Sequence, residues 1–356
     1  MACEAVCSGA AVEVRDEVQA YNAYINEEKC VHCGLCKKVC PHSRFPELKP
    51  PIQWRQGWAA DEAIRAHSSS GGAAAALTRS FISNGGYVCS CVFSHGEFLF
   101  EITNEIEKAQ AFAGSKYVKS NPAGIHKQIE NLLKTGEKVL FIGLPCQVAG
   151  LKNYIPDRLQ SHLYSVDLIC HGTPSPSLLR KHIRELGSDL DQMENITFRE
   201  KTGWKMTIPG LKGRTAVDDT YLMGFLSGRF YTENCYECAY AGINRVSDIT
   251  LGDSWGSDMK DELKKGLSLI LCQTEKGLEL LENADLHLED VDVEKAVSSN
   301  QQLRHPFART EKTTRFFRSY QRTGKFGQSF FLIEPKRVFK QQIKYVLIKL
   351  HLRKSQ

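Results

Sequence analysis

The chain has 356 residues, 42% of them apolar, which is enough for one large or two medium hydrophobic cores. Its 46 Lys and Arg against 41 Asp and Glu give a net charge of +5, too small to predict nucleic-acid binding. The opening residues show no secretory leader, and no apolar run approaches the ~18 residues of a membrane span, so we expect neither export nor a membrane-spanning helix.

Cysteines crowd the first 50 residues, which hold six of the thirteen in the chain. Without a secretory leader, this number of thiols predicts metal or redox chemistry in a reducing compartment, the cytoplasm. Cys30, Cys33, Cys36 and Cys40, followed by Pro41, have the C-x2-C-x2-C-x3-C-P spacing in which three thiolates bind one [4Fe–4S] cluster and the fourth binds its neighbour. A zinc site is the alternative, but zinc motifs usually come as separated C-x2-C pairs.

Cys3 and Cys7 repeat the last half of this spacing, and a short hairpin is predicted between them and Cys30, with strands at 12–15 and 21–25. The two-fold pattern would place Cys7 with Cys30, Cys33 and Cys36, and Cys3 with Cys40 on a second cluster that lacks two ligands. We therefore expect the true start to lie upstream of Met1. The alternative is that the second cluster is absent and that Cys3 is a free thiol.

Residues 55–300 alternate helix-like and strand-like segments, between a cysteine-rich domain at 1–50 and a tail at 301–356. The sequence predicts helices at 73–82, 125–134 and 178–186 and strands at 86–93, 138–142, 164–169 and 248–251, the last being the final buried strand. This alternation predicts an α/β fold, α+β overall, with a mixed, largely parallel sheet covered on its faces. In such sheets, ligands bind beyond the carboxyl ends of the strands.

A Ser/Gly loop opens the helix predicted at 73–82, and it consists of Ser68, Ser69, Ser70, Gly71 and Gly72. Backbone N–H groups and the helix dipole at such a loop favour a pyrophosphate. Ser/Gly turns also often do no more than cap a helix, so both interpretations stay open.

A second set of cysteines follows the predicted strands. Cys146 and Cys170 each come directly after a buried strand, and Cys235 and Cys238 form a C-x2-C pair in a turn. Four such thiols could bind a further cluster, whereas the alternative is that Cys146 and Cys170 are small core residues. Three further cysteines, which are Cys89, Cys91 and Cys272, lie in apolar stretches and are predicted to be core residues.

The tail from 304 to 356 carries 14 basic and two acidic residues, whereas the rest of the chain has a net charge of −7. Apolar residues recur at helical spacing from Val338 to Leu350. An amphipathic basic helix of this kind suits an acidic partner protein or an anionic membrane face, and a solvated tail is the simpler alternative.

Several stretches together resemble one family. They are Cys30–Pro41, 67–72, 114–117, 143–151, 167–176 and 234–256. In this order they resemble the coenzyme F420 hydrogenase/dehydrogenase beta-subunit family, which includes the plant 7-hydroxymethyl chlorophyll a reductases. The likeness covers about residues 3–260, and the incomplete first cysteine motif departs from the family pattern.

The resemblance implies FAD together with [4Fe–4S] clusters, in a flavin-binding domain behind a ferredoxin-like domain. It favours Cys146, Cys170, Cys235 and Cys238 as cluster ligands and the Ser/Gly loop as a phosphate site. It also makes Lys116 a candidate counter-charge for the FAD phosphates, with a solvated lysine as the alternative. Further candidates for contact with the flavin or a second substrate are Asn244, Arg245 and Asp253, although Asp253 could equally cap a strand.

His171, next to Cys170, could donate a proton to the reduced substrate or a hydrogen bond to a cluster sulfur, or it could be a packed core histidine. These residues predict an oxidoreductase that passes electrons between a ferredoxin-type or deazaflavin donor and a small organic acceptor through FAD. The rival prediction is a non-catalytic electron-delivery subunit, or an accessory protein of bacterial polysaccharide synthesis.

Overall fold

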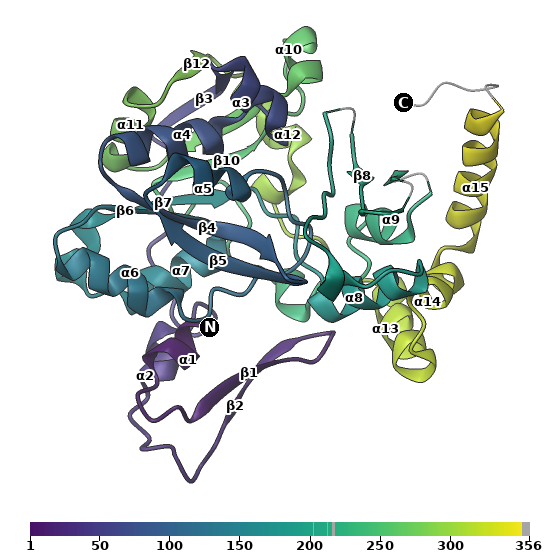
Figure 1. Ribbon diagram of the computed structural model, residues 1–356, viewed down its shortest axis with the longest axis horizontal. Coiled ribbons are helices and arrows are strands. Elements are labelled where there is room, and N and C mark those ends of the chain that lie inside the picture. The colour runs from purple at the N-terminus through teal and green to yellow at the C-terminus, as the bar shows by residue number, and fades with distance from the viewer. Residues whose placement is uncertain (202, 212, 216–217, 351–356) are drawn as a thin grey trace.

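The computed structural model describes residues 1–201, 203–211, 213–215 and 218–350. At its centre lies an eight-stranded mixed sheet with helices on both faces (Figure 1). From one edge to the other, the strands are β12 (Leu286–Glu289), β3 (Gln53–Ala59), β11 (Ser268–Cys272), β10 (Ile249–Asp253), β7 (Leu163–Leu168), β6 (Val139–Gly143), β4 (Tyr87–Ser94) and β5 (Glu97–Thr103).

Only the centre of this sheet is parallel. β4, β6, β7 and β10 run in the same direction, whereas every other neighbouring pair is antiparallel. The predicted mixed sheet is therefore confirmed, but the prediction that it is largely parallel is wrong, because β5 adds an antiparallel strand at one side and β11, β3 and β12 add three at the other. The strand predicted at 248–251 is also not the last buried one, since β11 follows it and is buried at all five residues.

Helices cover the central strands on both faces, as predicted. Along β6, Leu140 and Ile142 pack with α4 (Ala73–Ser83) and α11 (Glu275–Glu282). The alternate residues Val139 and Phe141 pack with α6 (Ile125–Lys134) and α7 (Pro145–Tyr154) on the other face. A strand that is apolar at every position is therefore one that is buried on both sides.

The cysteine-rich segment projects beneath this body in Figure 1 as α1 (Ala2–Val6), the hairpin β1 (Val12–Asp16) and β2 (Tyr21–Ile25), and α2 (Leu35–Val39). The predicted hairpin is confirmed. Its helices pack on α7 at Gly150, where an added Cβ would lie 3.6 Å from the Ala2 Cβ and 3.7 Å from the Pro41 Cδ.

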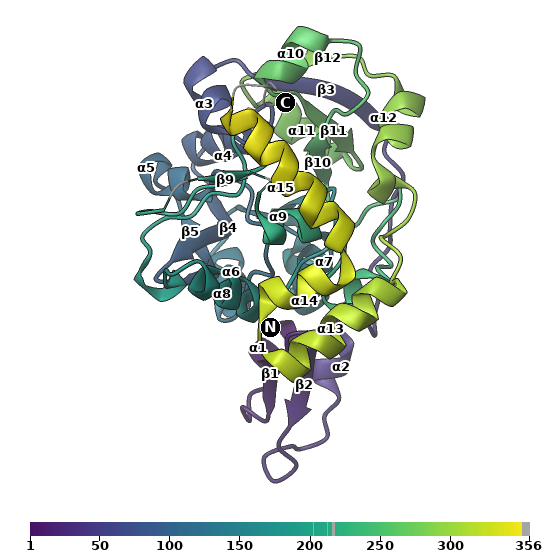
Figure 2. The same cartoon turned by 90° about the vertical axis from the view of Figure 1, so that its right-hand side faces the viewer.

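Four helices build a second, aromatic core: α8 (Pro176–Glu185), α9 (Thr220–Leu226), α13 (Glu311–Thr323) and α14 (Phe326–Ile333). The tail continues as α15 (Pro335–Lys349), which confirms the predicted helix and crosses in front of the body in Figure 2. No helix in the described ranges has both the length and the apolar character needed to cross a bilayer. The remaining short elements are α3 (Glu62–His67), α5 (Ile106–Ala109), α10 (Lys260–Lys265), α12 (Val293–Ser299), β8 (Lys205–Met206) and β9 (Arg214–Thr215).

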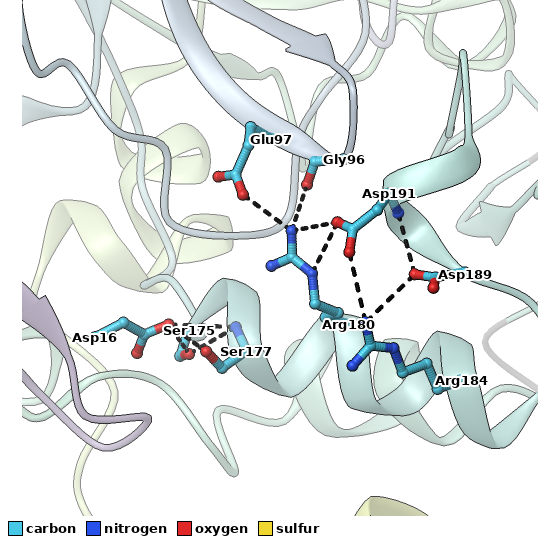
Figure 3. A network of polar contacts seen from close by, with 9 residues as sticks. All are labelled: Asp16, Gly96, Glu97, Ser175, Ser177, Arg180, Arg184, Asp189 and Asp191. Atoms are coloured by element: carbon cyan, nitrogen blue, oxygen red, sulfur yellow. Dashed lines mark hydrogen bonds and ion pairs between the residues drawn. The ribbon is translucent and has the colours of Figure 1, made fainter.

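Helix α8 ties the cysteine-rich segment to the sheet (Figure 3). At its N-terminus, Asp16 from the end of β1 accepts hydrogen bonds from the Ser175 hydroxyl (2.6 Å) and the Ser177 hydroxyl (2.8 Å). One turn further on, Arg180 pairs with Glu97 at the start of β5 and with Asp191. The hairpin is thus anchored beside the loop that leads from β7 into α8.

Candidate functional site

The thiols of the first motif lie on a tightly turned loop. Between Cys30 and α2 the backbone takes positive φ at His32 (53°) and Gly34 (71°), and no atom lies within 4 Å of the position of a Cβ on Gly34. Cys33 is exposed, whereas the other three motif cysteines are half-buried. An exposed loop of this shape, which carries several free thiols, fits thiolate binding of an iron–sulfur cluster.

Cys3 faces the end of the same motif. Burial raises the pKa of Cys3, and the neighbouring thiols of Cys40 and Cys36 raise it further. The Cys7 sulfur accepts a hydrogen bond from the Ala11 N–H at 3.2 Å. The predicted division of Cys3 and Cys7 between two clusters stays a prediction.

The second set of four cysteines meets at the carboxyl edge of the parallel strands. β6 and β7 are parallel neighbours that pair Gly143 with Asp167, so Cys146, in the first turn of α7, and Cys170, in the loop after β7, leave the sheet side by side. Burial raises the pKa of Cys170, and the charges of Cys235, Cys146 and Cys238 raise it further. Burial likewise raises the pKa of Cys146 to about 12.

The tertiary structure therefore brings together thiols that are up to 92 positions apart in the sequence numbering, from Cys146 to Cys238. Within the described residues, no three His, Cys, Asp or Glu side chains converge closely enough to hold a single metal ion. The assignment of individual cysteines as cluster ligands stays a prediction. Cys89 and Cys272 are fully buried, which confirms them as core residues, and Cys91 is half-buried against the core.

The buried side chain of Arg245 connects two segments of the four-cysteine set by hydrogen bonds. Its guanidinium donates to the Asp167 carboxylate at 2.9 Å, to the Leu168 carbonyl at 2.8 Å and to the Tyr240 carbonyl at 2.8 Å. It thereby joins the strand before Cys170 to the turn after Cys238. The predicted contact of Arg245 with a cofactor has no support here, because its donors are engaged within the protein, and the neighbouring Asn244 is exposed.

The Ser/Gly loop packs closely on the sheet before α4. An added Cβ on Gly71 would lie 2.4 Å from the Gly57 oxygen and 2.6 Å from the Ser268 nitrogen, so only glycine fits there. Gly72 has a φ of 89° and gives α4 no side-chain cap. The first-turn N–H groups of an eleven-residue helix therefore remain available to an anion.

A lysine that we did not predict reaches this loop. The Lys201 ammonium donates a hydrogen bond to the Ser70 carbonyl. Burial lowers the pKa of Lys201 to about 8, and the cations Arg65 and Arg199 contribute to the shift. The predicted counter-charge Lys116 is engaged elsewhere, because its ammonium donates to the carbonyls of Ala111, Phe112 and Ala113.

Between the loop and the cysteines lies an arginine-centred aromatic cluster. Arg199 donates to both oxygens of Asp253, at the end of β10, at 2.6 and 2.9 Å. Its guanidinium carbon lies 5.6 Å from the ring centroids of both Trp204 and Trp255. Asp253 was predicted from the strand end, whereas its arginine partner was not.

His171 completes the connection from this cluster to Cys170. Burial lowers the pKa of His171, Asp253 opposes that shift, and Arg199 adds to it. The buried Nδ1 has no hydrogen-bond partner among the described residues. Its ring is parallel to Phe225 at a centroid distance of 6.5 Å, and Tyr117 stacks on Phe225 at 4.4 Å.

Two family models match the chain. Residues 23–43 match the 4Fe-4S binding domain, and residues 136–298 match the C terminus of the coenzyme F420 hydrogenase/dehydrogenase beta subunit. The second match contains the four-cysteine set and the aromatic cluster. Residues 136–298 belong to this beta-subunit family. The expected resemblance is confirmed, and with it an iron–sulfur electron-transfer protein of the F420 hydrogenase/dehydrogenase family.

The beta-subunit fold is also seen in a solved structure. A chain of the F420-reducing [NiFe] hydrogenase complex from Methanosarcina barkeri, determined with xenon, matches with a TM-score of 0.51 and 15% identity. The match covers 72% of the present chain and 92% of the other, and at this identity it shows the fold alone. No curated protein matches the chain.

Sequence reasoning missed Arg199, Lys201 and Tyr117, which all join the site in this family member. Tyr117 lies in the stretch 114–117 that carried the resemblance, but only Lys116 was singled out there. Arg199 and Lys201 lie in a polar loop together with Trp204. That mixture of basic and aromatic residues was the available signal. Its partners are distant, because Asp253 lies 54 positions after Arg199 and Ser70 lies 131 positions before Lys201.

Proposed function

We propose that this chain is an iron–sulfur flavoprotein oxidoreductase that passes electrons through FAD, between a ferredoxin-type or deazaflavin (coenzyme F420) donor and a small organic acceptor. One observation carries the proposal. A continuous series of neighbouring groups runs from Cys170 through His171 and the Arg199–Asp253 pair to Lys201 at the Ser/Gly loop. Thiols suited to a cluster and a loop suited to a pyrophosphate thus lie on opposite sides of one aromatic cluster.

The residues divide into three proposed binding sets. The thiols of Cys30, Cys33, Cys36 and Cys40, with Cys3 and Cys7, would hold the clusters of the ferredoxin-like domain. The four thiols of Cys146, Cys170, Cys235 and Cys238 would hold a further cluster. The Ser/Gly loop, the N-terminus of α4 and Lys201 would hold the FAD pyrophosphate.

FAD, when bound, supplies the conversion between single electrons and electron pairs. The protein's task is to hold the flavin ring among Tyr117, Trp204, Trp255 and Arg199, away from water. His171 lies at this place with an unpartnered Nδ1, so it can hold a proton for the reduced acceptor. Donation of that proton requires the imidazolium form of His171, which burial disfavours and the nearby Asp253 carboxylate favours.

The proposal also includes a partner. The solved structure that shares the fold is that of a hydrogenase complex, and the exposed side chains of α15 form an apolar stripe of Phe339, Ile343 and Val346 beside Lys336 and Lys340. We propose that α15 docks an acidic electron-transfer protein. Clusters of this type fit the reducing conditions of the cytoplasm.

The test is anaerobic preparation of the full chain, with analysis of iron, sulfide and flavin. The expected result is both a flavin spectrum and iron in excess of a single cluster. Cys33→Ser should remove one cluster and slow electron entry from a ferredoxin while the flavin stays bound. The matched control is Cys89→Ser, a buried core cysteine that is not among the proposed ligands, which should leave the iron content unchanged. Preparations that hold neither sulfide nor flavin would refute the proposal.

A further inference from the structure

A buried tyrosine of the body contacts the ferredoxin-like domain directly after its cysteine motif. Tyr240 is 3% exposed, and its hydroxyl donates a hydrogen bond of 2.6 Å to the carbonyl of Pro41. Pro41 directly follows Cys40, the last thiol of the first motif. The backbone carbonyl of Tyr240 accepts from Arg245 at 2.8 Å, which fixes the tyrosine to the body.

The same tyrosine borders the four-cysteine set. Cys146 and Cys238 pack against the hydrophobic cluster that includes Tyr240. Tyr240 itself follows Cys238 by only two residues, so its side chain lies between the C-x2-C turn and Pro41. The pyrrolidine ring of Pro41 also lies close to the body: its Cδ is 3.7 Å from the position that a Cβ on Gly150 would take. Gly150 belongs to α7, the helix whose first turn contains Cys146.

We propose that Tyr240 is a positioning residue for electron transfer between the two thiol sets: its hydrogen bond to Pro41 holds Cys40 at a fixed spacing from Cys146 and Cys238. One electron passes from the reduced group held at Cys40 to the oxidised group held by the four-cysteine set, and no bond forms or breaks. Because transfer rates fall steeply with separation, a fixed spacing sets the rate. This inference rests on the proposed function, in which both thiol sets hold clusters.

Two variants separate the hydrogen bond from the ring. Tyr240→Phe keeps the buried ring and removes only the hydroxyl, and Tyr240→Leu removes both. Tyr154→Phe is the matched control, because this tyrosine belongs to the same hydrophobic cluster but its hydroxyl faces Glu130 at 3.4 Å. None of these substitutions replaces a proposed ligand.

The first measurement needs no cofactor. Hydrogen exchange of the segment around Cys40 and Pro41 should report about fivefold more frequent local opening in Tyr240→Phe, as expected for one lost hydrogen bond. The second measurement is the rate of electron transfer. After flash reduction of the ferredoxin-like domain, freeze-quench electron paramagnetic resonance should show slower electron arrival at the four-cysteine set in Tyr240→Phe, and slower still in Tyr240→Leu. The Tyr154→Phe control should match the unsubstituted protein in both.

The inference is overturned if both clusters load in Tyr240→Phe and Tyr240→Leu and the electron arrives as fast as in Tyr154→Phe. It is likewise overturned if local opening does not change. A different result marks failure of the proposed function itself: the unsubstituted protein would then lack iron and sulfide at the four-cysteine set, and no transfer would be observable in any variant.

Discussion

At the residue scale, the site depends on charged groups whose partners lie far away in the sequence. Lys201 is held at the Ser/Gly loop with a pKa of about 8, chiefly because it is buried and also because Arg65 and Arg199 lie nearby. A phosphate favours the protonated ammonium, so binding of an anion there raises the pKa. Anion affinity should therefore be complete below about pH 8 and should be lost as the pH rises through that value.

Lys201→Met should weaken FAD binding by about 10- to 100-fold, the usual effect of losing one charge-assisted hydrogen bond. It should also remove the fall in affinity above pH 8 that the lysine pKa predicts. The measurement is fluorescence titration of the apoprotein with FAD across the pH range. Lys205→Met is the control, because Lys205 pairs with Glu200 at 2.8 Å. The FAD affinity of this variant should depend on pH in the same way as that of the unsubstituted protein. An unchanged pH profile in Lys201→Met would contradict this assignment.

At the scale of elements, the hairpin β1–β2 contacts the body near its turn and not along its strands. The residues of β2 are mostly exposed, whereas Asp16 caps α8 through Ser175 and Ser177 (Figure 3). The N–H of Glu233, two residues before Cys235, donates a further hydrogen bond of 2.9 Å to the Gln19 carbonyl. The hairpin thus touches both loops that flank the four-cysteine set.

Asp16→Ala should therefore loosen the hairpin and the start of α8 together, at a cost of about 1–2 kcal/mol in unfolding free energy for a lost helix cap. Urea unfolding measures the cost, and limited proteolysis should show faster cleavage in 17–20. The control is Glu13→Ala on the same strand, whose exposed pair with Arg15 contributes little, so no change is expected. Equal protease resistance of Asp16→Ala and Glu13→Ala would argue against the anchor.

At the scale of the whole molecule, the chain is an acidic body with a basic helical tail. Along α15, Val338 is buried, whereas Phe339 is 63% exposed and Val346 is 51% exposed. The helix therefore adds little to the core, and its exposed apolar stripe is available to a partner.

Removal of residues 335–356 should lower Tm only slightly and abolish salt-sensitive binding of an acidic ferredoxin, measured by calorimetry at two ionic strengths. The double variant Phe339→Ser/Ile343→Ser keeps the charge and should lose most of the affinity, which separates the apolar contribution from the electrostatic one. Pelleting with anionic liposomes in the absence of ferredoxin binding would contradict protein docking and point to a membrane surface.

The sequence by itself determined the local features. Cysteine spacing revealed the cluster motif, and periodicity located the helices at 73–82 and 125–134, because both signals come from neighbouring residues. Strands β3, β5, β11 and β12 were not among the predicted strands, and β10 was taken as the last buried strand. The apolar run at 268–272 does not reveal its partner β3, which lies more than two hundred positions earlier in the chain.

Only the tertiary structure decided which distant groups meet. Parallel pairing of β6 with β7 joins the loops of Cys146 and Cys170, and β10 carries Asp253 to Arg199. The docking of α1 and α2 on α7 brings Pro41, which follows Cys40, to Tyr240. Contacts of this kind depend on strand order and domain docking, which the whole hydrophobic core determines and no single stretch of sequence encodes.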